Sequence, residues 1–130
     1  MSFKETIERT ATDWISDLES RSLDTVVSKW TDEIHYAVHP DKAGVYPMTR
    51  EQFRTNERTA IIFQNLKSFK ISVNEIYSDT EKRTVTMVCT SNGETEFGPY
   101  STDCLFVLTT TEDGKKIVKL NEWIDTHTRQ

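Results

Sequence analysis

Apolar residues at the start of the chain recur every three or four positions, the spacing that places them on one side of an α-helix. The first stripe predicts a helix over about residues 3–19, with apolar members Ile7, Ala11, Trp14, Ile15 and Leu18. Ser22 is suited to cap a second, short helix, because serine accepts hydrogen bonds from free N–H groups of a first helical turn. The apolar side of this helix comprises Leu23, Val26, Val27 and Trp30. We expect the two helices to form a hairpin.

The next segment has a different period. From Glu33 to His39 apolar and polar residues alternate, which predicts a strand that ends at Pro40. Residues 40–48 hold two of the three prolines and their apolar members do not alternate, so we interpret them as a loop. Long loops often carry functional residues.

A third helix is predicted after this loop. Thr49 and Gln52 have the spacing of a capping box, so the helix is expected to begin at Arg50 and to end near Asn65. Its expected inner stripe includes Phe53, Glu57, Ala60 and Ile61. Glu57 would therefore face the rest of the fold.

The chain beyond Ser68 alternates in the manner of strands. Four strands are expected, with apolar positions Phe69, Ile71, Val73 and Ile76; Val85, Met87 and Cys89; Tyr100, Cys104, Phe106 and Leu108; and residues 117–124. Short turn-rich segments at residues 79–82, 91–94 and 111–114 separate them, which predicts an antiparallel meander. The order helix, helix, strand, helix and four strands indicates an α+β fold with helices on one face of a curved sheet.

Composition and net charge exclude several classes of protein. The 130 residues fit one domain, residues 1–130, and a net charge of -5 argues against a nucleic-acid partner. No stretch approaches the roughly 18 apolar residues of a membrane span, and the start of the chain has no apolar leader. We therefore expect a cytoplasmic protein with no membrane span. Cys89 and Cys104 lie in apolar runs and are interpreted as reduced core thiols.

Three stretches carry a resemblance to a known family: residues 24–34, residues 97–108 and residues 112–125. With the element order, they resemble the SnoaL-like branch of the nuclear-transport-factor-like cone fold, over nearly the whole chain. The resemblance implies a cone-shaped α+β barrel, in which a curved antiparallel sheet wraps around an apolar pocket and three helices from the N-terminal half cover it. With the loop that ends at Met48, the pattern is most similar to short fungal isomerases of meroterpenoid pathways, which implies catalysis without a cofactor and a homodimer.

Two residues are the candidate catalytic pair. Glu57 would enter the pocket from the third helix, and His127 would reach it from the end of the last strand. A carboxylate and an imidazole across an apolar pocket can remove a proton at one atom and return one at another. For Glu57 the alternative is a surface position paired with Arg54 or Arg58, and for His127 it is a frayed chain end.

Five further residues are candidates for binding polar groups of a substrate: His39, Tyr46, Thr102, Asn121 and Glu122. The resemblance implies that an acidic residue of the last strand acts as acid or base, and Glu122 lies nearest to that position. Which face of the last strand lines the pocket stays open, because alternation alone does not decide it. No metal site is expected, since His35 and His39 would lie roughly 13 Å apart on one strand.

The leading hypothesis is a cofactor-independent isomerase or cyclase that rearranges a hydrophobic polycyclic polyketide or meroterpenoid. Motifs for nucleotides, dinucleotides, zinc proteases and serine hydrolases are absent from the sequence. A homodimer is expected because the strands near Val85–Val88 and Leu105–Leu108 are apolar on both faces. The alternatives are a non-catalytic binding or dimerisation module and, less favoured, a dehydratase of the scytalone type.

Overall fold

A computed structural model describes residues 1–125. The first helix, α1 (Phe3–Glu19), has the predicted bounds, and Ser2 and Glu5 form a capping box at its start. The second, α2 (Leu23–Val26), begins after the predicted cap Ser22. It is shorter than expected, because Trp30 is already the first residue of a strand. None of the helices in the described part is both long and apolar enough to cross a membrane.

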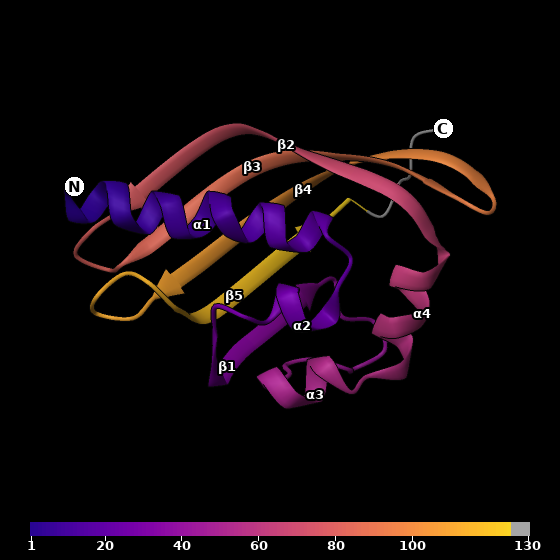
Figure 1. Cartoon of the computed structure of the whole chain (residues 1–130), viewed down its shortest axis with the longest axis horizontal. Coiled ribbons are helices and arrows are strands. Elements are labelled where there is room, and N and C mark those ends of the chain that lie inside the picture. Colours follow the sequence, from indigo (N-terminus) through magenta and orange to yellow (C-terminus); the bar gives the residue numbers. More distant parts are fainter. Residues whose placement is uncertain (126–130) are drawn as a thin grey trace.

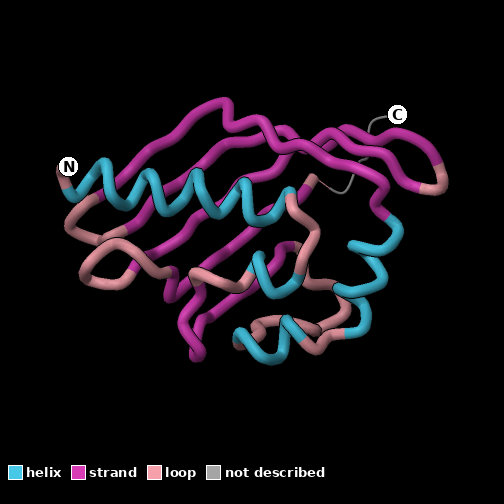
Figure 2. The backbone as a smooth tube through the Cα atoms, viewed as in Figure 1, coloured by secondary structure: helices cyan, strands magenta, loops and turns pink. Residues whose placement is uncertain are grey.

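Five strands form one curved sheet (Figure 2). They are β1 (Trp30–His39), β2 (Leu66–Asp79), β3 (Thr84–Thr95), β4 (Gly98–Thr110) and β5 (Ile117–Ile124), in the spatial order β1-β5-β4-β3-β2. The predicted antiparallel meander from β2 to β5 is confirmed. The sheet is not wholly antiparallel, however, because β1 pairs with β5 in parallel at the opposite edge from β2.

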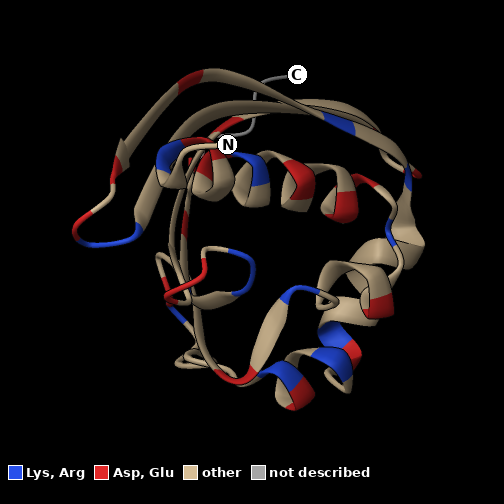
Figure 3. Cartoon of the chain, turned by 60° about the vertical axis from the view of Figure 1, so that its left-hand side comes forward, with Lys and Arg blue, Asp and Glu red and all other residues tan. Residues whose placement is uncertain are grey.

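The predicted third helix is two helices, α3 (Arg50–Arg54) and α4 (Glu57–Asn65). The capping box of Thr49 and Gln52 is present at the start of α3. The break follows from a second cap: the side chain of Asn56 accepts a hydrogen bond from the backbone N–H of Thr59 at 3.0 Å and starts a new helix. Acidic and basic residues are interspersed on α3, where Arg54 pairs with Glu51 and Asp24 (Figure 3).

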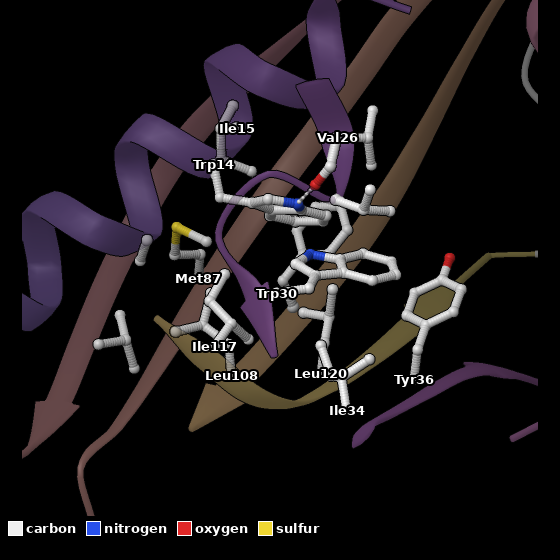
Figure 4. Packing of buried hydrophobic residues seen from close by; sticks show 14 of the residues in the cluster. Trp14, Ile15, Val26, Trp30, Ile34, Tyr36, Met87, Leu108, Ile117 and Leu120 are labelled. Carbon is white, nitrogen blue, oxygen red and sulfur yellow. Dashed lines mark hydrogen bonds between the residues drawn. The ribbon is translucent and has the colours of Figure 1, made fainter. Parts of the chain in front are cut away.

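The hydrophobic core lies between α1 and the concave face of the sheet (Figures 1 and 4). Trp14 packs edge-on against Phe106 with ring centroids 5.2 Å apart, and its indole N–H donates to the carbonyl of Val26 at 3.1 Å. Leu108 and Leu120 are fully buried beside them. This packing fills one end of the concave face. The strands arch over α1 (Figure 3), which gives the predicted α+β cone.

Candidate functional site

The other end of the concave face is hollow. An apolar cavity of about 340 Å³ lies there, within the range of small-molecule sites. Its walls come from β1 to β5, α1, α3, α4 and the loop after β1. The polar side chains that line it are Tyr36, Tyr46, Thr59, Ser91, Tyr100, Thr102, Cys104 and Glu122.

Glu122 is the one carboxylate among the described residues that line this cavity. On β5 it follows the core residue Leu120 by two positions, so both side chains point to the concave face. Burial in the apolar wall raises the pKa of Glu122 to about 7, although the hydrogen bond from Tyr36 works in the opposite direction. A carboxyl group with this pKa exchanges its proton near neutral pH.

Two tyrosines flank the carboxylate. The Tyr36 hydroxyl donates to Glu122 Oε1 over 3.4 Å, a long hydrogen bond, and the Tyr36 ring packs edge-on against Tyr46. Burial is the main cause that raises the pKa of both phenols, and the neighbouring charge of Glu122 adds to it. Both phenols therefore stay protonated at neutral pH. The Tyr36 hydrogen is engaged with Glu122, and the Tyr46 hydroxyl can donate to a substrate oxygen.

The loop after β1 holds Tyr46 in place. The Asp41 carboxylate accepts hydrogen bonds from the backbone N–H groups of Val45 at 2.9 Å and of Tyr46 at 3.1 Å. Beyond it, Met48 exchanges backbone hydrogen bonds with Tyr36, which ties the loop to β1. The prediction that residues 40–48 form a loop is confirmed, and the structure adds that Tyr46 of this loop lines the cavity.

Three of the five predicted binding residues, Tyr46, Thr102 and Glu122, line the cavity. The hydroxyl of Thr102 donates to the backbone carbonyl of Asp125 at 3.0 Å, so its hydrogen is engaged in holding the end of β5 against β4.

His39 and Asn121 do not line the cavity, and their expected contact with a substrate there is wrong. In the parallel pairing of β1 with β5, Val38 lies beside Glu122 and faces inward, so the alternation turns the adjacent His39 and Asn121 to the outer face. There His39 Nε2 lies 2.9 Å from the Asn121 side-chain oxygen, and the imidazole stacks on Trp123.

Glu57 is also displaced from the cavity. It is exposed at the first turn of α4 and borders a shallow hollow on the outside of the molecule with Asn56 and Arg58. The cap at Asn56 resets the helical phase, so Thr59 and Phe63 face the cavity instead. The expectation that Glu57 turns inward is therefore wrong. His127, the second predicted catalytic residue, lies outside the described residues.

The sequence predicts no polar role in the site for Tyr36, Ser91, Tyr100 or Cys104. Residues 91–94 have the composition of a turn, so the sequence does not predict that Ser91 lies on a strand. In the structure β3 continues to Thr95 and the chain reverses after it. The sequence predicts that Cys104 is a core thiol. It is directly opposite Cys89 on β3, and both are buried free thiols, but Cys104 also touches the cavity.

No group of three or more His, Cys, Asp or Glu side chains within residues 1–125 is placed to hold a metal ion. In the same part of the chain, no Lys, Arg or His side chain lines the cavity. The chemistry that these residues offer is thus proton transfer at one carboxyl group and hydrogen bonding by phenols and hydroxyls.

Comparisons with known proteins agree on the fold. No family model matches the chain. The crystal structure of BvnE pinacolase from Penicillium brevicompactum superposes with a TM-score of 0.88 at 25% identity, covering 96% of this chain and 89% of that one. AusH from Aspergillus nidulans superposes with a TM-score of 0.86 at 18% identity, covering 98% and 88%.

A protein described as NTF2-like, from Exiguobacterium, superposes with a TM-score of 0.71 at 18% identity over 91% of this chain and 99% of that one. Among curated sequences, Monooxygenase nsrS from Aspergillus novofumigatus is 25% identical over 113 residues, which cover 82% of this chain and 71% of the relative. The structural neighbours confirm the resemblance drawn from the sequence.

Proposed function

We propose that this chain, with the NTF2-like and SnoaL-like cone fold, is a cofactor-independent isomerase or cyclase. Its substrate is a polycyclic meroterpenoid or polyketide intermediate of secondary metabolism, held in the apolar cavity. The observation that carries the proposal is Glu122, a carboxyl group with a pKa of about 7 in a wall without compensating cations among the described residues. Acids and bases are most effective when their pKa lies near the working pH.

The chemistry follows from the neighbours of the carboxylate. Ionised Glu122 accepts a proton from a substrate hydroxyl or from a carbon next to a carbonyl, and the electron pair that is released moves within the substrate. Tyr46 donates a hydrogen bond to the oxygen on which negative charge develops, and Tyr36 can join it once Glu122 has taken up the proton and no longer needs the Tyr36 hydrogen. Protonated Glu122 then returns the proton at another atom. Because no atom is gained or lost, the product is an isomer of the substrate.

Glu122 thus takes the role that the sequence suggested for Glu57. The similarity to a protein described as a pinacolase supports a rearrangement as the reaction type. A cavity with several titratable side chains also favours an enzyme over a purely structural module.

A homodimer is part of the proposal. The outer face of the sheet carries Val88, Leu105 and Val107 on adjacent strands, next to Trp123, which is 41% exposed, and Tyr77, which is 58% exposed. A second copy of the chain would cover this face. Light scattering at high micromolar concentration should give twice the mass of the chain, and a monomer at that concentration would contradict this part.

The reaction is tested by incubating the protein with a panel of polycyclic meroterpenoid and polyketide ketones. We expect conversion of at least one compound to a product of the same mass, by wild-type protein and by a Glu112→Gln control in the exposed turn between β4 and β5, but not by Glu122→Gln. Retention of full conversion by Glu122→Gln would remove this residue from the mechanism.

A monooxygenase is the second candidate, supported by the name of the curated relative from Aspergillus novofumigatus. The two functions differ in their mass balance. A monooxygenase would consume dioxygen and add one oxygen atom to the product, whereas the isomerase leaves both unchanged. An oxygen electrode and mass spectrometry of the same reaction therefore decide between them.

A further inference from the structure

A second polar group lies in the cavity, away from the carboxylate. The hydroxyls of Ser91 on β3 and Tyr100 on β4 are 3.2 Å apart and hydrogen-bonded, and both residues line the cavity. Ser91 is only 8% exposed and Tyr100 is partly buried, so this is a largely buried polar pair in an apolar wall. The acid and base chemistry proposed above makes no use of it.

The backbone is shaped to hold Tyr100 in this position. Gly93 lies directly opposite Tyr100 in the pairing of β3 with β4. A Cβ atom at residue 93 would come within 2.6 Å of the Tyr100 ring and 2.7 Å of the backbone oxygen of Ser68. The absence of a side chain at Gly93 therefore lets the tyrosine ring lie against the strand, with its hydroxyl at Ser91.

The pair has hydrogen-bonding capacity left over. Two hydroxyls that bond to each other use one hydrogen between them, and within residues 1–125 neither has another partner. The second hydrogen and the remaining lone pairs are available to a ligand. A buried polar group without a hydrogen-bond partner is unfavourable, so a ligand with an oxygen atom at this point should bind more tightly than one with an apolar group there.

The two polar points are far apart. Ser91 is the register partner of Thr102, and Glu122 is the partner of Phe106, so the two sites lie four residues apart along β4. That separation corresponds to about 13 Å along the strand direction. One small functional group cannot contact both, whereas a rigid molecule of several fused rings can.

We propose that Ser91 and Tyr100 form a second anchor that selects substrates with an oxygen function at each end of an apolar polycycle. One oxygen lies at Glu122 and Tyr36, where the reaction occurs, and the other lies at the Ser91–Tyr100 pair. This inference rests on the proposed function, since it specifies the substrate class of the same cavity. Tyr100 and Ser91 are positioning residues and take no part in proton transfer.

The test compares two steroids as probes by isothermal titration calorimetry. Androstenedione is a rigid four-ring diketone with one oxygen at each end, and its matched analogue has a methylene in place of the ketone on the five-membered ring. Wild-type protein should bind the diketone about tenfold more tightly than the analogue, the effect of one well-placed hydrogen bond. Tyr100→Phe and Ser91→Ala should each lower that preference, the double variant should abolish it, and all three should leave the affinity for the monoketone within about twofold.

A merely structural role of the pair would weaken both steroids equally, and that result would overturn the inference. Thr12→Ala, which removes a hydroxyl from the exposed face of α1, away from both the cavity and the outer face of the sheet, should keep the tenfold preference. If Tyr100→Phe does not fold, the affinities of the two steroids for Ser91→Ala still test the inference. Equal binding of both steroids by wild-type protein would overturn the second anchor alone, whereas failure of both to bind would contradict the cavity as a polycycle site and hence the proposed function as well.

Discussion

The two ends of the concave face are built from the same strands and differ in what covers them. At the packed end, α1 brings Trp14 against Phe106 and leaves Leu120 with no exposed surface. At the hollow end the cover is α4, in which no residue is buried. Two positions along β5 therefore separate a core leucine from Glu122. The alternation of a strand determines which side chains share a face, and the covering helix determines whether that face becomes core or cavity.

The largest effect is expected at the packed end. Trp14→Ala should lower the free energy of unfolding by about 3–5 kcal/mol, because it opens a cavity and leaves the carbonyl of Val26 without its donor. Phe63→Ala, which removes an aromatic ring from the cavity wall on α4, should cost about 1 kcal/mol or less. Urea denaturation of both variants measures the difference, and equal losses would mean that the two ends are packed alike.

The second largest effect is expected on catalytic turnover. Glu122→Gln should lower turnover of any compound that the protein converts by about 100-fold or more, because a positioned acid or base contributes at least that much. Glu57→Gln should stay within about twofold of wild type, since that side chain is exposed outside the cavity. Steady-state kinetics on one converted compound compares the two variants, and the opposite ranking would restore Glu57 as the catalytic carboxyl.

Glu122 should also make stability depend on pH. Its pKa in the folded protein is about 7, above the ordinary value of 4.5, so between these values the folded state holds more protons than the unfolded state. The free energy of unfolding should then fall as pH rises through that window, by about 3 kcal/mol. Urea denaturation across the window should show this decline in wild-type protein, and Glu122→Gln should lack it. A Glu122→Gln profile parallel to that of wild type would contradict the raised pKa.

The smallest effect is expected on the outer face. His39→Ala removes the contact with Asn121 and the stacking on Trp123, and should cost about 1 kcal/mol of stability or less. Turnover should stay within about twofold of wild type, because the imidazole is on the other side of the sheet from the cavity. Kinetics and denaturation of this one variant suffice, and a loss of turnover as large as that of Glu122→Gln would place the reaction elsewhere.

The sequence predicts the elements better than it predicts the site. The apolar stripe of α1 and the meander from β2 to β5 follow from periodicity, because each element buries one face over many residues. The site depends on single positions. The cap at Asn56 changes the direction of Glu57, and nothing in the helical stripe distinguishes one long helix from two short ones.

The sequence also does not predict which side chains of the last strand, β5, face the cavity. Alternation groups Glu122 with Leu120 and separates both from Asn121, but it leaves open which group faces inward. The parallel pairing with β1 settles this, because Val38 and Glu122 lie side by side and both line the cavity. That pairing joins segments far apart in the sequence, and the local alternation of apolar and polar residues cannot predict it.

The same parallel pairing has a consequence for how the protein folds during synthesis. α3, α4, β2, β3 and β4 all lie between β1 and β5 in the sequence, so the neighbour of β1 emerges from the ribosome long after β1 itself. Contacts of such high sequence separation form slowly, because a long loop must close before they contribute stability. Until then the nascent chain has a helix and an expanding hairpin array but no Glu122, and a chain that stops before β5 lacks the one carboxylate that residues 1–125 place in the cavity wall.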